Sequence, residues 1–184
     1  MNNYVGCGTG RNFPLLVERV GERGRIIGVD YSEGMLGQAR RRIQAKGWRN
    51  IELVRDDAAR LDGVSGPVDA VTAIWCLGIV YDLEAALNRI MDLMRPGGSL
   101  SIMDFGKSRP DHGLLRWLFP FYSIALQRAG IDSAEDLDNA ELEAKWARGK
   151  DVLNARLGSM NKEHYLNGTG LIIAARKPQE EINT

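Results

Sequence analysis

Three glycines at alternate positions, Gly6, Gly8 and Gly10, stand almost at the start of this 184-residue chain, directly before a helical pattern. Alternate glycines at such a place let the backbone turn sharply and approach a ligand closely. A dinucleotide fingerprint would need the spacing G-x-G-x-x-G, and Arg11 occupies the place of its third glycine. The turn therefore indicates a ligand contact, with a purely structural tight turn as the alternative, and it argues against an NAD-dependent oxidoreductase.

Acidic residues end the next two strand-like segments, "RIIGVD" at Asp30 and "NIELVRDDA" at Asp57. A carboxylate at the first place can accept both hydroxyls of a ribose, as in dinucleotide sites. A carboxylate at the second can accept from an adenine amino group, with the amide of Ala58 completing the edge. Either acid alone is also explained as an ordinary strand-end residue. Because open α/β sheets bind ligands at the carboxyl ends of their strands, we expect the glycine turn and both acids to face one cleft.

Strand and helix patterns alternate through the first 106 residues. Helical spacing of apolar residues covers 11–23, 32–47 and 82–95, and short strand patterns cover 25–30, 50–58, 68–77 and 99–105. Such alternation predicts right-handed βαβ units. We therefore predict a three-layer, Rossmann-like α/β fold with an open, mostly parallel sheet.

The last third has a different pattern. Residues 112–130 are apolar and helical with a kink at Pro120, 133–157 are helical and charged, and Asn167-Gly168 separates two strand-like runs. We expect two antiparallel edge strands, the second being Gly170–Arg176. The whole chain, 1–184, then forms one domain with a ligand-binding core (1–106), a helical lid or acceptor region (107–157), a C-terminal hairpin (158–177) and a tail (178–184).

Composition narrows the classes of partner. Lysine and arginine number 24, as do aspartate and glutamate, so the formal net charge is zero. This balance argues against a nucleic-acid partner, which needs a basic surplus. Cys7 and Cys76 lie too far apart for a metal-binding cluster, and we expect no metal. Free thiols and the absence of a signal-peptide or membrane-spanning pattern predict a cytoplasmic location.

Five segments in order resemble the class I S-adenosylmethionine-dependent methyltransferases, from about Tyr4 to Phe105. "VGCGTGRNF" resembles the first motif of the family, "IIGVDYSEGML" the ribose segment and "VRDDAARL" the adenine segment. "VDAVTAIWCLGIVYD" and "LMRPGGSLSIMDF" resemble the motifs of the fourth and fifth strands. The resemblance implies S-adenosyl-L-methionine as the cofactor and methyl transfer as the reaction.

Carried over to this sequence, the resemblance implies a set of cofactor-binding residues. The glycine turn would face the methionine part, Asp30 the ribose, and Asp57 with Ala58 the adenine. The full set is Gly6, Cys7, Gly8, Thr9, Gly10, Asn12, Asp30, Tyr31, Ser32, Met35, Asp57, Ala58, Trp75 and Cys76. Trp75 and Cys76 would form the floor beneath the methyl donor.

The start of the chain departs from the family pattern. Tyr4 occupies the place of a usual acidic residue, and only "MNNY" precedes the glycine turn. Asn2 and Asn3 are unusual in a central strand, where apolar residues are expected on both faces. We interpret the chain as similar to a family member without its N-terminal segment. A weakly active or inactive methyltransferase-like module that binds a partner is the alternative function.

The acceptor is indicated only by the segment after the fifth strand. The apolar run "GLLRWLFPFYSIAL" is typical either of a helix buried on the sheet or of a lid over a hydrophobic acceptor, and 113–126 could also contact a membrane surface or a second copy of the chain. The run resembles the ubiquinone/menaquinone C-methyltransferase group, which implies a small hydrophobic quinone-, lipid- or phenol-like acceptor. Tyr81, Asp104, His112 and His164 are candidate bases, and no catalytic residue is assigned.

Overall fold

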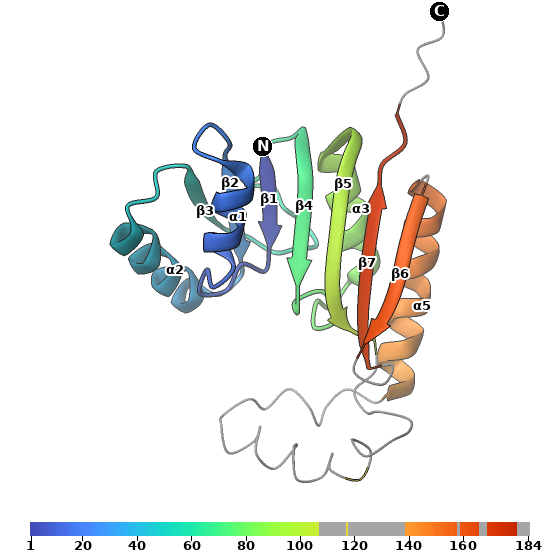
Figure 1. Cartoon of the computed structure of the whole chain (residues 1–184). Coiled ribbons are helices and arrows are strands. Elements are labelled where there is room, and N and C mark those ends of the chain that lie inside the picture. The colour runs from blue at the N-terminus through green and yellow to red at the C-terminus, as the bar shows by residue number, and fades with distance from the viewer. Residues whose placement is uncertain (107–116, 118–138, 158, 166–168, 180–184) are drawn as a thin grey trace, which may run out of the picture.

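A single sheet organises the chain in the computed structural model, which describes residues 1–106, 117, 139–157, 159–165 and 169–179. The strand order is β3-β2-β1-β4-β5-β7-β6. The first five strands in this order are parallel, and β7 pairs antiparallel with both β5 and β6 (Figure 1). The strands are β1 (Asn2–Val5), β2 (Ile26–Asp30), β3 (Ile51–Arg55), β4 (Val68–Ile74), β5 (Met94–Phe105), β6 (Ser159–Tyr165) and β7 (Gly170–Arg176). The predicted three-layer, Rossmann-like fold is confirmed.

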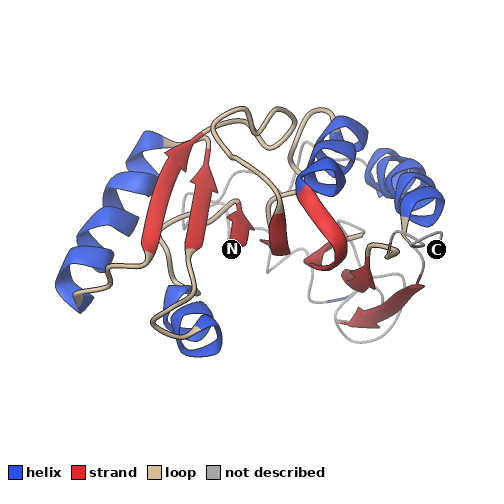
Figure 2. Ribbon diagram, turned by 90° about the horizontal axis from the view of Figure 1, so that it is seen from above, coloured by secondary structure: helices blue, strands red, loops and turns tan. Residues whose placement is uncertain are grey.

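Helices cover both faces of this sheet. On one face lie α1 (Phe13–Val20) and α2 (Glu33–Lys46), and on the other lie α3 (Leu83–Leu93) and α5 (Asn139–Arg156) (Figures 1 and 2). Ser32 caps the N-terminus of α2, since its hydroxyl accepts a hydrogen bond from the Met35 backbone N–H. Each face of the sheet has its own cluster of buried apolar side chains. Because these clusters are closely packed, the strand ends and the side chains at those ends are held in fixed positions.

The short strand β1 lies in the middle of the sheet, paired with β2 on one side and β4 on the other. Tyr4 and Val5 are buried on opposite faces, as a central strand requires. Asn3 is also buried, and its side-chain nitrogen and oxygen have no hydrogen-bond partner among the described residues. The unusual asparagine in a central strand is therefore a real feature of the fold.

Two strand boundaries and the place of the C-terminal hairpin differ from those predicted. The fourth strand ends at Ile74 and not at Leu77, because Trp75 has a left-handed φ of 52° that ends the extended run. The fifth strand begins at Met94, since Met94 pairs with Val68 before the register shifts. The predicted hairpin strands are present, but only β6 is an edge strand, because β7 inserts between β5 and β6. The turn residues Asn167 and Gly168 lie outside the described residues.

The helix α5 belongs to the core layer that α3 forms. Leu142, Trp146 and Leu153 of α5 are buried in the same apolar cluster as α3, and Gly149 lies against Leu83. The rest of the segment expected to form the lid, 107–116 and 118–138, lies outside the described residues, as do the contact surface at 113–126, apart from Trp117, and the tail residues 180–184. Trp117 is described, and its side chain is exposed.

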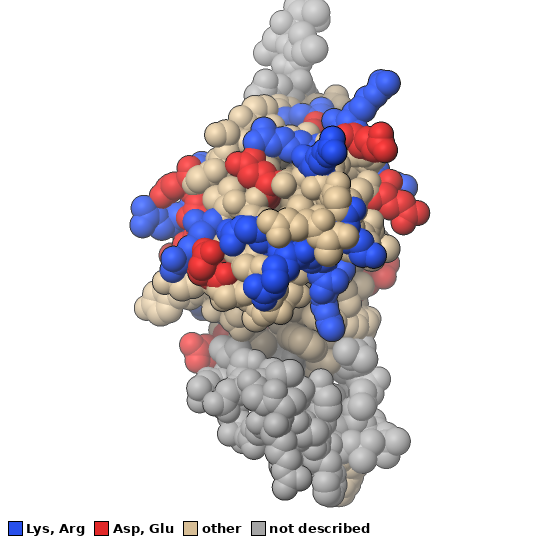
Figure 3. Space-filling view, turned by 90° about the vertical axis from the view of Figure 1, so that its left-hand side faces the viewer, with Lys and Arg blue, Asp and Glu red and all other residues tan. Residues whose placement is uncertain are grey.

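Charges are mixed on the face of the molecule that Figure 3 shows, where lysine and arginine lie beside aspartate and glutamate. Ion pairs join the two signs across elements, as between Arg148 of α5 and Glu84 of α3, 2.8 Å apart. The described part of the chain contains no helix long and apolar enough to cross a membrane.

Candidate donor-binding site

A cavity of about 320 Å³ lies at the carboxyl ends of the parallel strands, the edge toward which the arrowheads of β1, β4 and β5 point in Figure 1. This volume is in the range typical of small-molecule sites. The wall is formed by the ends of β1 and β2 and by the loops after β2, β3 and β4. Its residues are Val5, Gly6, Val29, Asp30, Tyr31, Asp56, Asp57, Ala58, Cys76, Ile79, Val80 and Tyr81.

The glycine turn that follows β1 forms one side of the cavity. The pairing with β2 extends into this turn, since the backbone N–H of Cys7 donates to Val29 O at 2.8 Å. Gly6 has a φ of 66° and lies against Cys76, whose Cβ would be 2.3 Å from any Cβ at position 6. A side chain at Gly6 would therefore collide with the loop after β4, and glycine is required for the two walls to meet.

Asp30 fixes the geometry between the glycine turn and β2. Its carboxylate accepts hydrogen bonds from the backbone N–H of Gly8 at 2.7 Å and of Ser32 at 2.9 Å. Each of its oxygens accepts one of these bonds, so each keeps capacity to accept another. The side chain faces the cavity, and it can therefore hold two neighbouring hydroxyl groups of a ligand while it orders the turn.

Two consecutive acids line the cavity beyond β3, where one was predicted. The Asp57 carboxylate accepts from Ala59 N at 2.9 Å. Asp56, which was not singled out from the sequence, accepts from the backbone N–H of Asp57 at 2.8 Å and of Gly63 at 2.7 Å. Asp56 thus shapes the loop that presents Asp57 and Ala58 to the cavity.

The loop after β4 forms the opposite wall and is held by two charged side chains that the sequence pattern did not single out for this role. The buried carboxylate of Asp104 accepts from Leu77 N at 2.8 Å and Gly78 N at 3.0 Å, and burial raises its pKa. From α5, the ammonium group of Lys145 donates to Gly78 O at 2.8 Å and to Val80 O. Burial lowers the pKa of Lys145. Together they fix the backbone that carries Cys76, Ile79, Val80 and Tyr81.

Six of the predicted cofactor-binding residues line the cavity: Gly6, Asp30, Tyr31, Asp57, Ala58 and Cys76. Gly8 and Ser32 do not line the cavity, but their backbone N–H groups donate to the Asp30 carboxylate, which does. Cys7 is buried under the turn, and burial raises the pKa of its thiol to about 12.

The other predicted residues lie outside the cavity wall. Asn12 donates to the Tyr4 hydroxyl at 2.7 Å, and Thr9 O accepts from Arg42 at 3.1 Å. Gly10 packs against the ring of Phe13, and Met35 of α2 is partly exposed. Trp75 is not among the residues that line the cavity. Its ring stacks on Phe105, with centroids 6.1 Å apart.

The candidate bases lie in different places. Tyr81 lines the cavity and is fully exposed, whereas Asp104 is occupied by backbone amides. His164 lies on the edge strand β6, and His112 is outside the described residues. Among the described residues, no group of three or more histidine, cysteine or acidic side chains is placed to hold a metal ion.

Known proteins with a similar sequence share this part of the chain. The family described as "Methyltransferase domain" matches residues 4–98. A ubiquinone/menaquinone biosynthesis C-methyltransferase UbiE from Shewanella frigidimarina is 31% identical over 143 residues, which are 77% of this chain and 56% of that protein. The UbiE of Shewanella piezotolerans is 28% identical over 177 residues, 92% of this chain and 70% of that protein. The chain therefore spans between about half and about two thirds of the length of these two relatives.

Solved structures share the fold. A SAM-dependent methyltransferase from Aquifex aeolicus has a TM-score of 0.65 at 19% identity, over 96% of this chain and 81% of that one. The N-methyltransferase NodS from Bradyrhizobium japonicum, in complex with S-adenosyl-L-homocysteine, has a TM-score of 0.62 at 16% identity, over 97% of this chain and 78% of that one. At such identities the likeness concerns the fold alone.

Proposed function

The chain belongs to the class I S-adenosylmethionine-dependent methyltransferases, and from this premise we propose that it transfers a methyl group to a ring carbon of a small hydrophobic acceptor of the quinol or phenol type. One observation carries the proposal. Gly6, Asp30 and Asp57, from the ends of three neighbouring strands, line the same cavity.

The residues present fit the donor. Asp30 has free acceptor capacity for two ribose hydroxyls, and Asp57 with the Ala58 amide offers an acceptor and a donor for the edge of an adenine. Tyr31 lies beside them at the cavity wall. The narrow junction of Gly6 with Cys76 is where the methionine part would lie, because it is at the ends of β1 and β4, next to the strands β2 and β3 whose ends would hold the ribose and the adenine. When bound, S-adenosylmethionine supplies an electrophilic methyl group, whose bonding electron pair returns to sulfur as the acceptor carbon takes the methyl.

The protein's part in the reaction is to orient the reactants and to exclude water. The loop held by Asp104 and Lys145 keeps Ile79 and Val80 against the cavity, so that apolar side chains cover the donor. After transfer, the acceptor carbon loses its proton and the ring regains aromaticity. That proton passes to solvent, which reaches the cavity mouth at the exposed Tyr81.

The acceptor class rests on two supports. The relatives are named as ubiquinone/menaquinone C-methyltransferases. The loop after β4 brings Ile79, Val80 and Tyr81 to the cavity, and these side chains suit an apolar molecule that binds next to the donor. In this proposal residues 1–106 bind the donor, 107–157 contribute to the acceptor side, and 158–177 are the C-terminal hairpin. The free thiols Cys7 and Cys76 suit a reducing compartment such as the cytoplasm.

The test is methyl transfer to a quinol with an unsubstituted ring carbon. The protein is incubated with S-adenosylmethionine labelled in the methyl group and a naphthoquinol that carries a short isoprenoid chain. We expect label in a product heavier by one CH₂. A matched quinol whose ring carbon is already methylated should take up none. Label found on oxygen, or equal uptake by both quinols, would contradict transfer to carbon.

A further inference from the structure

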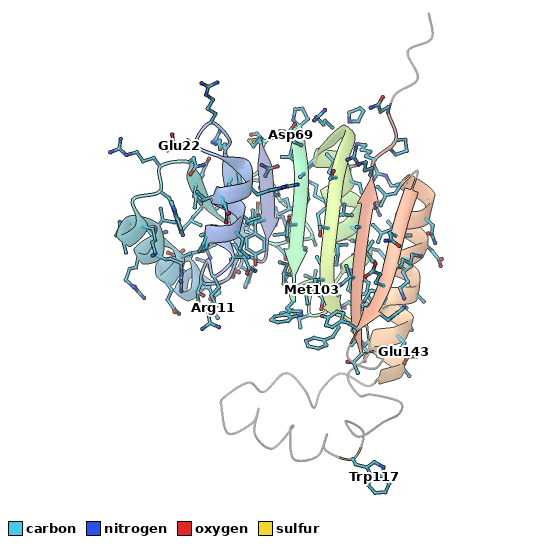
Figure 4. All side chains as sticks on the ribbon, viewed as in Figure 1. Arg11, Glu22, Asp69, Met103, Trp117 and Glu143 are labelled. Atoms are coloured by element: carbon cyan, nitrogen blue, oxygen red, sulfur yellow. The ribbon has the colours of Figure 1, made fainter. Side chains whose placement is uncertain are left out.

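Three aromatic side chains gather at the carboxyl edge of the sheet beside the cavity. They are Trp75 directly after β4, Phe105 at the end of β5 and Tyr165 at the end of β6, and we call them the aromatic patch. The rings of Trp75 and Phe105 are nearly parallel, at 13°, and the Trp75 indole N–H donates to the Tyr165 hydroxyl at 3.2 Å. Figure 4 shows side chains at this edge, where Met103 is labelled on β5.

The backbone is shaped to assemble this patch. Trp75 N donates to Met103 O at 2.8 Å, which fixes where the chain leaves β4. Phe105 and Tyr165 both lie opposite Gly170 of β7. A Cβ at Gly170 would be 2.2 Å from the Tyr165 ring, so the glycine leaves room for Tyr165 to lie across β7 and reach Trp75. Residues from β5, β6 and β7 and from the loop after β4 thus contribute to one arrangement.

Burial does not account for this arrangement. Trp75 is 56% exposed and Phe105 is 40% exposed, although both are large apolar side chains. Trp75 also holds a left-handed φ of 52°, which is unfavourable for a bulky residue and is found mostly where function demands it. An exposed, flat and oriented pair of rings is suited to stacking against another flat ring.

The patch is continuous with the donor cavity. Cys76 follows Trp75 directly, lines the cavity, and donates from its thiol to Val5 O at 3.3 Å. In the sheet, the junction of Cys76 with Gly6 lies at the ends of β4 and β1, and the acids Asp30 and Asp57 follow the next strands, β2 and β3, on the side away from Trp75. A ring lying on Trp75 would therefore sit next to the end of the cavity assigned to the methyl group.

We infer that Trp75, supported by Phe105 and Tyr165, binds the acceptor and selects a flat aromatic ring over a saturated ring or a simple lipid chain. This inference rests on the proposed function, because it places the donor in the adjoining cavity. Trp75 supplies the stacking surface, Phe105 backs its ring, and Tyr165 fixes its rotation through the hydrogen bond to the indole N–H. A saturated ring of the same size has no π-face and would lose the stacking contribution.

The test compares two ring compounds on the chain saturated with S-adenosylhomocysteine. Calorimetry measures the affinity for 2-naphthol, which is flat, and for decahydro-2-naphthol, its saturated counterpart. Aromatic pairs contribute enough beyond area burial that we expect about 3- to 10-fold tighter binding of 2-naphthol. Trp75→Leu should remove this preference. Tyr165→Phe should weaken the preference, because it keeps the aromatic ring but removes the hydroxyl that accepts from the Trp75 indole N–H.

Leu15→Ala is the matched control, since Leu15 is a comparably exposed apolar side chain on α1, away from the patch. It should leave the preference unchanged. An unchanged preference in Trp75→Leu, or no preference in the unmodified chain, would overturn the inference while S-adenosylhomocysteine binding stays intact. Failure of the unmodified chain to bind S-adenosylhomocysteine would instead overturn the proposed function itself.

Discussion

Alanine substitutions at two glycines of the same turn separate the contact between the cavity walls from the conformation of the turn. Gly6 has a φ of 66° and Gly8 a φ of 54°, so both backbones are left-handed. A residue with a side chain is destabilised in this left-handed conformation by about 1–2 kcal/mol. Both Gly6→Ala and Gly8→Ala should therefore lower the free energy of unfolding by at least this amount.

Only at Gly6 does the added methyl group meet other atoms. Its Cβ would lie 2.3 Å from Cys76 Cβ and 2.5 Å from Cys76 Sγ, whereas nothing lies within 4 Å at Gly8. Overpacking of this kind typically costs about 1–3 kcal/mol. We therefore expect the free energy of unfolding to fall by about 2–5 kcal/mol in Gly6→Ala and by about 1–2 kcal/mol in Gly8→Ala.

Urea denaturation followed by circular dichroism measures both losses. The added substitution Cys76→Gly removes the atoms that collide with the new methyl group, so it should cost less in the Gly6→Ala background than in the unmodified chain. The difference is a coupling energy, expected to exceed about 1 kcal/mol for residues in direct contact. Equal losses for the two alanine variants, or no coupling with Cys76, would refute the close approach of the two walls.

Three further predictions concern the Asp30 carboxylate, the Lys145 ammonium group that holds the loop after β4, and the cysteine thiols. The Asp30 carboxylate accepts from two backbone N–H groups, and Asp30→Asn would turn an N–H donor toward one of them. This substitution should raise the Kd for S-adenosylhomocysteine, measured by calorimetry, about 10- to 100-fold. Lys145→Met keeps the apolar stem but removes the donor to the loop after β4, and should lower the free energy of unfolding in urea by about 1–3 kcal/mol. The raised pKa of Cys7, about 12, leaves about 1 thiolate in 10,000 at pH 8, so Ellman's reagent should react with it far more slowly than in urea. Burial raises the pKa of Cys76 as well, and the same protection is expected there.

Each of these predictions has an outcome that contradicts it. Unchanged donor affinity in Asp30→Asn would remove that carboxylate from the site. Full stability of Lys145→Met would mean that the hydrogen bonds from Lys145 are not needed to hold the loop after β4. The rate of thiol modification should rise about tenfold per pH unit well below the raised pKa, because the thiolate is the reactive form. A rate in the folded chain equal to that in urea would contradict burial of the thiols.

The fold and the composition of the cavity were predictable to a large extent because they depend on local patterns. Alternating strands and helices determine a parallel sheet, and the carboxyl ends of its strands fall on one edge. Gly6, Asp30 and Asp57 could therefore be assigned to one cleft without any knowledge of contacts. The pairing of β7 between β5 and β6 could not, because a hairpin signal gives the pairing of two strands and not their place in the sheet.

The features of the site that the sequence did not indicate depend on long-range contacts and on one dihedral angle. The family resemblance implies a place for Trp75 beneath the donor, whereas a left-handed φ at this residue directs its ring toward Phe105 and Tyr165. Lys145 reaches the cavity loop across 67 residues of sequence, and no spacing rule indicates such a contact. Asp56 could have been considered, since it stands beside Asp57 at the end of the same strand.

The most direct test of the account is a crystal structure of the chain with S-adenosylhomocysteine. We expect the ribose hydroxyls on the Asp30 carboxylate, the adenine edge at Asp57 and Ala58, and the sulfur beside Gly6 and Cys76. A ligand bound outside this cavity, or an adenosine that contacts neither carboxylate, would contradict the convergence of the three strand ends on one donor.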